Sequence, residues 1–155
     1  MRGFRIGELL VEQGVLTPRQ VEHVLKVQKA TNRPFGDLAE RLYGVEPRII
    51  EDVWVEQYLR ISGVLDLDEA QVDEQCLRVL NQRQVWQFQL LPLHREDAEL
   101  HVATTADQLV RALNFCSRKL DEPVFLRIAE RQQLRDFLMK HYPVPEHIAQ
   151  YATKL

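Results

Sequence analysis

The N-terminal part of this 155-residue chain contains one segment twice. When the sequence is shifted by 29 residues, residues 34–57 fall on residues 5–28 without a gap, and seven aligned positions are identical. Apolar residues also match at other positions, so both copies share the spacing that directs folding. Because two copies are too few for a solenoid, we predict a duplicated helical hairpin whose halves pack as pseudo-symmetric partners. The identical pairs are Gly7/Gly36, Leu9/Leu38, Pro18/Pro47, Arg19/Arg48, Glu22/Glu51, Val24/Val53 and Gln28/Gln57.

Each copy begins with a glycine followed by a short amphipathic helix. These helices are expected over residues 8–13 and 37–42, and Gly14 or Gly44 is expected to end them. A second helix then follows in each copy, so the two hairpins have the same plan.

Each second helix is expected to begin at a proline. Pro18 and Pro47 stand at the predicted first helical position, and Thr17 can serve as N-cap with Gln20 completing a capping box. Both helices carry an apolar stripe at positions i, i+3 and i+4, which a glutamine ends at i+7. A single glutamine usually caps a helix end or faces solvent, but its recurrence in register is explained less well in that way. The stripes are Val21, Val24, Leu25 and Gln28 in the first copy, and Ile50, Val53, Trp54 and Gln57 in the second.

Two interpretations of the leading glycines remain open. Gly7 and Gly36 stand where the first helices begin, and the free backbone N–H groups there, together with the helix dipole, can hold an anion that a glycine lets approach closely. Arg5 lies two residues before Gly7, where a guanidinium could bind phosphate or stack on a purine. Alternatively, both glycines relieve helix packing and Arg5 is a solvated surface cation.

The pattern changes near residues 61–70, where Gly63 and a run of acids occur. The order of elements that follows predicts a small α+β layer with a short, mostly antiparallel sheet. We expect helices over 73–81 and 82–88, a strand hairpin over 89–94 and 99–104, a helix over 107–120, a strand over 124–128 and a helix over 130–141.

The fold class expected for the whole chain is therefore α+β. We expect a helical subdomain over residues 1–62, an α+β subdomain over 63–143 and a C-terminal tail over 144–155.

Composition limits the possible partners. The net charge is −3 without a block of like charge, so no footprint for duplex nucleic acid is expected. There is no signal peptide and no 18-residue apolar run, which predicts a cytoplasmic protein without membrane insertion. Cys76 and Cys116 lack metal-ligand spacing and are expected to be reduced, buried thiols.

No catalytic or metal-binding constellation is found. None of the six glycines is followed by lysine, so the chain lacks the phosphate loop of an ATPase. The five histidines form no HExxH motif, and neither serine lies in a nucleophile elbow. His94 and His101 are expected to face each other as cross-strand surface neighbours. From their helical spacing, Trp54, Tyr58, Trp86 and Phe88 are expected in a core or subdomain interface rather than in a base-stacking platform.

The repeats resemble the tandem 24-residue motifs of the MshEN domain, the cyclic di-GMP-binding N-terminal domain of type II secretion and type IV pilus assembly ATPases. The second copy departs from the motif, since Pro34 takes the arginine position after Arg33, Ala39 replaces an aliphatic residue, and Tyr43-Gly44 shifts the second glycine by one. In the first copy the motif positions hold Arg5, Ile6, Gly7, Leu10, Gly14, Val15, Leu16, Val21, Leu25 and Gln28; in the second, Phe35, Gly36, Ile50, Trp54 and Gln57 fit.

The second half is similar to the second N-terminal subdomain of the same ATPases. Leu91-Pro92-Leu93 and Val102-Ala103-Thr104-Thr105 hold the places of its characteristic strands, and Asp107 lies one residue out of register with an aspartate that can contribute to the ligand site. The resemblance implies a non-catalytic module that binds cyclic di-GMP, uses no metal or cofactor, and signals to a partner protein of secretion or pilus type. The ligand residues that it implies are Arg5, Ile6, Gly7, Leu10, Gly14, Leu25, Gln28, Arg33, Phe35, Gly36, Trp54, Gln57 and Asp107.

A second interpretation is a protein-interaction adaptor that kept the fold and lost the ligand. The imperfect second repeat favours it. Such an adaptor would dock on secretion, pilus or other envelope machinery through its helix faces, and would expose an apolar patch on its outer helices or in residues 143–155.

Overall fold

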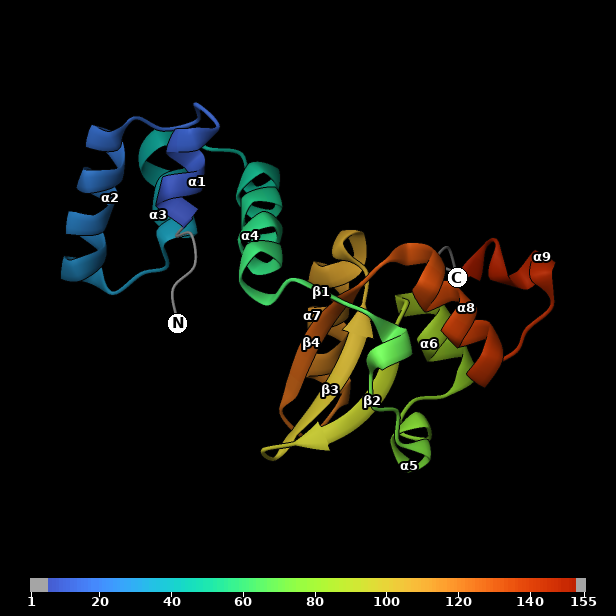
Figure 1. Ribbon diagram of the computed structural model, residues 1–155. Helices are drawn as coiled ribbons and strands as arrows, with labels where there is room; N and C mark the ends of the chain where they lie inside the picture. The colour runs from blue at the N-terminus through green and yellow to red at the C-terminus, as the bar shows by residue number, and fades with distance from the viewer. Residues whose placement is uncertain (1–5, 153–155) are drawn as a thin grey trace. The chain divides into compact units, whose positions relative to one another are not determined.

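The computed structural model describes residues 6–152, and the chain divides into two compact units, Met1–Ile61 and Ser62–Leu155. Four helices make up the repeated region, as the sequence predicts (Figure 1). They are α1 (Ile6–Glu12), α2 (Pro18–Thr31), α3 (Phe35–Tyr43) and α4 (Pro47–Ser62).

Local signals explain where α2 begins and ends. Thr17 is its N-cap and Pro18 its first residue. The Gln20 backbone N–H donates to Thr17 Oγ1 at 3.2 Å, and the Thr17 backbone N–H donates to Gln20 Oε1 at 2.8 Å. This capping box satisfies two backbone donors that the first turn of a helix leaves unpaired, which confirms the predicted helix start. Asn32, in the left-handed conformation with φ 59°, ends the helix.

The displaced glycine of the second repeat reflects a longer helix. α3 has nine residues and α1 has seven, so Tyr43 is still helical where its counterpart Gly14 already lies in a turn. Gly44 then ends α3 in the left-handed conformation, with φ 66°, and its backbone N–H donates to the Glu40 carbonyl at 3.0 Å. The shift by one residue is thus a change in helix length at a position where glycine is favoured.

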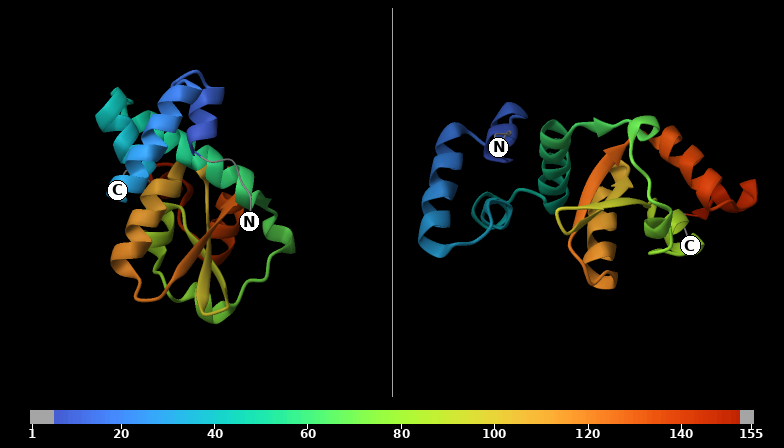
Figure 2. Two further views of the ribbon diagram at one scale, coloured as in Figure 1. Left: turned by 90° about the vertical axis from the view of Figure 1, so that its left-hand side faces the viewer. Right: turned by 60° about the horizontal axis from the view of Figure 1, so that its bottom comes forward.

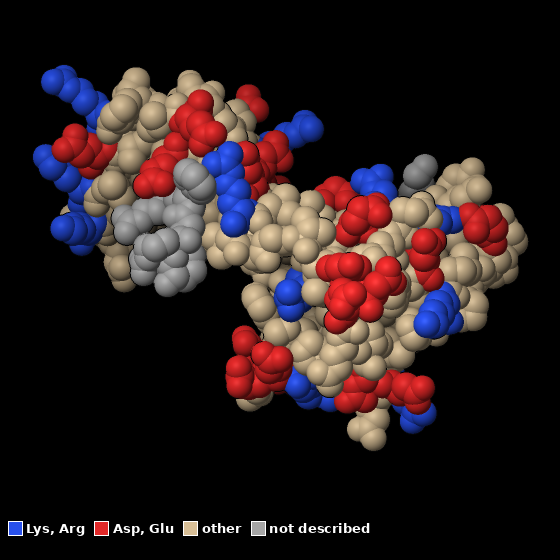
Figure 3. All heavy atoms as spheres, in the orientation of Figure 1, with Lys and Arg blue, Asp and Glu red and all other residues tan. Residues whose placement is uncertain are grey.

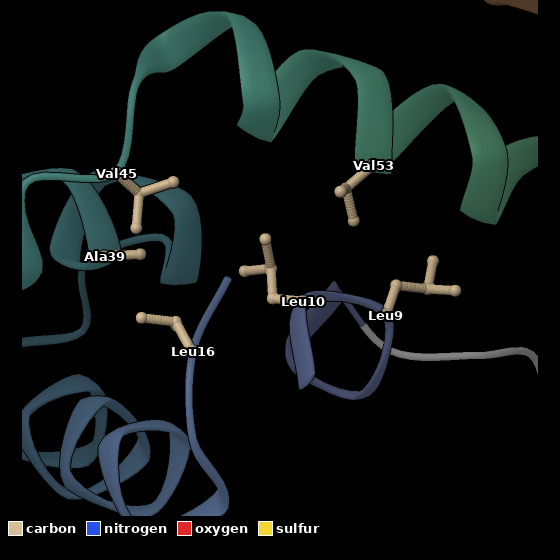
Figure 4. Packing of buried hydrophobic residues seen from close by; sticks show 6 residues of the cluster. All are labelled: Leu9, Leu10, Leu16, Ala39, Val45 and Val53. Carbon is tan, nitrogen blue, oxygen red and sulfur yellow. The ribbon is translucent and has the colours of Figure 1, made fainter. Parts of the chain in front are cut away.

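The core of the first unit is built from equivalent positions of the two repeats. Leu10 and its counterpart Ala39 are both fully buried, and Leu16 packs in the same cluster as its counterpart Val45 (Figure 4). Val53 of α4 is also fully buried and completes this side of the core. At one pair of equivalent positions, a large residue of the first copy, Leu10, is thus matched by a small one of the second, Ala39.

Polar side chains connect α1 to α4 at the surface of this unit. Gln13 Nε2 donates to Glu56 Oε2 at 2.6 Å, and the Arg60 guanidinium bridges Glu56 at 3.0 Å and Glu12 at 3.3 Å. Exposed pairs of this kind contribute little individually, about 0–1 kcal/mol each, so the buried contacts dominate the packing.

The leading glycines let helices approach each other closely. A Cβ added to Gly7 would lie 2.9 Å from Val21 Cγ1 and 3.2 Å from the ring of Phe35. A Cβ added to Gly36 would lie 2.6 Å from Ile50 Cγ2. Real side chains do not tolerate such distances, so both positions need glycine for packing. The structure therefore supports the packing interpretation of these glycines on the side where a Cβ would stand.

The second unit contains a four-stranded sheet in the order β1-β4-β3-β2. The α+β class is confirmed, but the expectation of a mostly antiparallel sheet is wrong. Only β2 and β3 pair antiparallel, whereas β4 runs parallel to both β3 and β1. The helix between β3 and β4 returns the chain to the same end of the sheet, and such a crossover produces parallel pairing. The strands are β1 (Val64–Leu65), β2 (Leu91–Glu96), β3 (Glu99–Thr104) and β4 (Val124–Ala129).

The helices of the second unit lie close to their predicted ranges. Figure 2 shows α7 running alongside the strands. Residues 73–81, expected as one helix, form only the single turn α5, and the tail contains the short α9. The elements are α5 (Glu74–Leu77), α6 (Gln82–Phe88), α7 (Leu109–Lys119), α8 (Arg131–His141) and α9 (Glu146–Ala149), with 3-10 turns η1 (Leu67–Glu69) and η2 (Ala106–Gln108).

Trp86 and Phe88, two of the aromatic residues expected in a core or interface, pack within this unit. Trp86 is buried, and its Nε1 donates to the Tyr142 carbonyl at 2.7 Å. The rings of Phe88 and Phe115 stack with centroids 4.1 Å apart. These contacts satisfy the polar end of the indole and bury the ring faces, which leaves no stacking platform on these residues.

Both cysteines are buried free thiols, as predicted. Burial raises the pKa of Cys116 to about 11, and burial also raises the pKa of Cys76. Neither is therefore a reactive thiolate near neutral pH.

Charges of both signs are mixed on the visible face of the first unit (Figure 3). Within residues 6–152, no helix combines the length and the apolar character needed to cross a bilayer.

The two histidines of the hairpin face each other as expected. His94 pairs with His101 in the β2–β3 register, and their rings stack with centroids 4.7 Å apart. His101 is not a surface residue, because it is only 7% exposed and its ring meets Phe125 of β4 edge-on.

Burial, together with the charge that His94 can carry, lowers the pKa of His101. Arg127 of β4 acts in the same direction, whereas the carboxylates of Glu96 and Glu99 oppose it. The neutral ring is therefore the form that the fold accommodates.

The glycine contacts predict a specific pattern of stability. Gly36→Ala should destabilise the protein by about 1–3 kcal/mol, because its Cβ collides with Ile50. In an Ile50→Ala background the same change should be neutral or slightly stabilising, since alanine is the better helix former by about 1 kcal/mol. Urea unfolding of the wild type, the two single variants and the double variant measures this coupling. A double variant destabilised by the sum of the two single effects would contradict the packing role.

Gly14→Ala is the matched control for that cycle. Nothing lies within 4 Å of its Cβ position, but its φ is +73°, so the cost of this substitution comes from the backbone. That cost should be the same with and without Ile50→Ala.

We expect acid to destabilise the second unit through His101. Since the folded-state pKa is lowered, the unfolded chain binds more protons between that value and 6.5, the ordinary pKa of histidine. Stability should be retained above about pH 6.5 and lost as the pH falls below it. In urea unfolding at a series of pH values, His101→Phe should reduce the loss of stability at low pH. The part of the loss that comes from His141 should remain, because burial also lowers the pKa of that residue. His147→Phe, on exposed α9, is the control, and an unchanged slope for His101→Phe would refute the assignment.

Candidate functional site

A shallow groove of about 500 Å³ lies between α1 and α2 in the first repeat. Gly7 forms part of its α1 wall, and Leu25, which is 40% exposed, forms part of its α2 wall. The walls are mainly apolar, and two carboxylates add polar groups. A groove of this kind can cover one face of a flat ring while polar groups contact its edge. The lining residues are Gly7, Glu8, Val11, Pro18, Val21, Glu22 and Leu25.

Three of the aliphatic and aromatic residues predicted to cover a ligand pack within the unit. Leu10 has no exposed surface, so its side chain belongs to the core and cannot contact a ligand in this conformation. Ile6 and Phe35 are half-buried and pack against the same core cluster, and the ring of Phe35 also covers Gly7. These residues therefore shape the site from within.

Two predicted residues, Gln28 and Arg33, are brought together at the turn between α2 and α3. Gln28 Nε2 donates to the Arg33 carbonyl at 3.1 Å, so this glutamine stabilises the turn. The Arg33 guanidinium lies 3.4 Å from the carboxylate of Asp37, one turn into α3. Hydrogen bonds from Arg41, and then from Arg33, keep the pKa of Asp37 below its ordinary value. Asp37 is thus ionised at neutral pH and pairs with both Arg33, at 3.4 Å, and Arg41, at 3.2 Å.

The remaining predicted residues of the first unit are more dispersed. Trp54 is half-buried on α4, with its ring centroid 5.6 Å from that of Tyr58, and Gln57 is half-buried one turn further on. Gly14 is exposed in the turn after α1. Arg5 lies outside the described residues.

Asp107 belongs to the second unit, in η2, and lines a polar pocket of about 440 Å³. Its carboxylate lies 3.1 Å from the Arg131 guanidinium of α8. Burial favours a higher pKa for Asp107, but hydrogen bonding with Thr105 and the charge of Arg131 outweigh it, so the pKa is lowered. Arg135 of α8 pairs with Glu146 in the same pocket. Each arginine therefore has an acidic partner, and the pocket carries little net charge.

The groove contains residues that were not among the predicted ligand residues. Pro18 and Glu22 belong to pairs that are identical in the two repeats, and Glu8 has a similar counterpart in Asp37. Identity between the copies was thus the signal that could have found them. Val11 differs from its counterpart Glu40, so the repeat carries no signal for it.

No group of three or more histidine, cysteine or acidic side chains within residues 6–152 could hold a metal ion.

Comparisons with solved structures identify the fold. The structure of MshE with cdg matches at 26% identity with a TM-score of 0.51, covering 90% of this chain and 99% of that chain. Coverage of 90% requires that most of the repeated region be included. Two structures of the N-terminal domain of XpsE match at 20% and 21% identity, with TM-scores of 0.46 and 0.45. They cover 89% and 92% of this chain, and 93% and 99% of their own. No curated protein matches the sequence significantly.

A family model provides the second line of evidence. The model of the MshEN domain matches residues 57–148, which is more than half of the chain and includes most of the second unit. The structural similarity to MshE extends this likeness to the helical repeats. The chain therefore belongs to the MshEN domain family.

Proposed function

We propose that this chain is a non-catalytic regulatory module that binds cyclic di-GMP through its two repeats and signals to a partner protein. One observation carries the proposal: MshE, whose structure contains cdg (cyclic di-GMP), matches 90% of the chain at 26% identity. The repeats that carry the motif fold here as two equivalent hairpins with a shared core.

The groove between α1 and α2 is the part of the first repeat best suited to a nucleotide. Its apolar walls, Val11, Val21 and Leu25, can cover a guanine base. Glu8 and Glu22 can accept hydrogen bonds from the N–H groups of the base edge. Arg5, two residues before Gly7 in sequence, is proposed to pair with a phosphate, and Gln28 is proposed to add a polar contact.

The ligand-free adaptor remains a second candidate, because specific departures favour it. In the second repeat Pro34 replaces the motif arginine, and Arg33 is engaged with Asp37. Ile148 and Tyr151 near the C-terminus are 40% and 57% exposed, which is the apolar surface that a docking adaptor would use. An adaptor for secretion, pilus or other envelope machinery would bind its partner equally well with and without nucleotide.

Isothermal titration with cyclic di-GMP tests the proposal directly. We expect saturable binding at tens of micromolar ligand or below, and Arg5→Ala should weaken it by about 10- to 150-fold, the cost of a lost charge-assisted contact. Gln28→Ala should weaken it less, by about 2- to 10-fold, because a neutral hydrogen bond is lost. Arg118→Ala, at an exposed position of α7, is the control and should leave affinity unchanged.

The absence of heat from folded protein would refute nucleotide binding. Recovery of the same partner in a pull-down with and without cyclic di-GMP would then favour the adaptor.

A further inference from the structure

The two repeats do not offer the same surface, although their helices match. The groove of the first repeat is lined by Val11, Val21 and Leu25. A shift of 29 residues places Glu40, Ile50 and Trp54 at the corresponding positions. Each replacement is larger, and one of them adds a carboxylate.

The glycines of both repeats are covered by side chains, so the difference between the repeats lies in the residues further along the second helix. A Cβ added to Gly7 would lie 2.9 Å from Val21 Cγ1 and 3.2 Å from the Phe35 ring, and one added to Gly36 would lie 2.6 Å from Ile50 Cγ2. The ring of Trp54 lies beside Tyr58, with centroids 5.6 Å apart at 43°, and the indole is half-buried. By contrast, Leu25 is 40% exposed and forms a groove wall. The room that the first repeat leaves for a flat ring is therefore reduced in the second.

The charges of the second repeat also make it less suited to an anionic nucleotide. Glu40, half-buried on α3, places a carboxylate where the first repeat has Val11. The Arg33 guanidinium is engaged with Asp37 at 3.4 Å, and Pro34 removes a backbone N–H immediately before α3. An anionic nucleotide would meet an added negative charge and fewer available donors there.

We infer that the groove of the first repeat holds one guanine nucleotide unit, and that the second repeat supports it without gripping the other half of the ligand. This inference rests on the proposed binding of cyclic di-GMP, restricts it from both repeats to the first, and specifies its ligand class, a single guanylate unit. If both halves were gripped, joining them covalently would raise affinity by about 10²- to 10⁴-fold over one half alone. With one working groove, the cyclic dinucleotide gains mainly a twofold statistical advantage from its two identical halves.

The test compares cyclic di-GMP, linear pGpG and 5′-GMP by isothermal titration against the full chain. We expect the three dissociation constants to lie within about tenfold of one another. This range is well below the gain in affinity expected if both repeats bound the ligand. The equivalent positions Leu25 and Trp54 supply a matched pair of variants. Leu25→Ala should weaken cyclic di-GMP by tenfold or more, and Trp54→Ala by less than threefold, with thermal melts showing that both remain folded.

The outcomes separate the two proposals. Tight binding of cyclic di-GMP with GMP weaker by 10²-fold or more, or equal losses for Leu25→Ala and Trp54→Ala, would overturn the single-groove inference and leave the proposed function intact. Failure of all three nucleotides to bind folded protein would overturn the proposed function, and the inference with it.

Discussion

The first unit depends on the close approach of two helices at a glycine, made once in each repeat. With no Cβ at Gly7 or Gly36, the side chains of Val21 and Ile50 reach the backbone of the preceding helix. This contact packs the two helices of each hairpin together, and Leu9 and Leu10 of the first helix lie in the shared core. Leu10 and its counterpart Ala39 are fully buried in the same cluster, where a second leucine would add volume to a closely packed interior. The departure of Ala39 from the family motif is thus a packing complement.

Much of the fold could be predicted from local signals. The capping box at Thr17 and the prolines that start α2 and α4 depend on neighbouring residues, so the sequence shows them directly. Strand pairing is a long-range property, and the sequence carried no sign that β4 lies between β3 and β1. β1 has two residues, too few for a periodic pattern, and its existence depends on the edge that β4 provides.

The candidate site was less predictable because motif positions do not show which way a side chain faces. Leu10 and Leu25 both match the family motif, yet one has no exposed surface and the other lines a groove. Gln28 was singled out as a ligand residue, and its amide is also used to hold the Arg33 carbonyl. The ion pair between Asp107 and Arg131 joins residues 24 positions apart on different elements, and no local pattern links them. Periodicity alone gives the helix face of a residue but not which neighbours cover that face.

The two buried thiols have a practical consequence. With its pKa near 11, Cys116 is thiolate in only about one molecule in ten thousand at neutral pH, and Cys76 is shielded in the same way. A cysteine introduced on the surface will therefore react with a maleimide or a spin label far ahead of the natural ones. Probe pairs can be attached, one in each unit, without first removing any native residue, and their separation can be followed in solution.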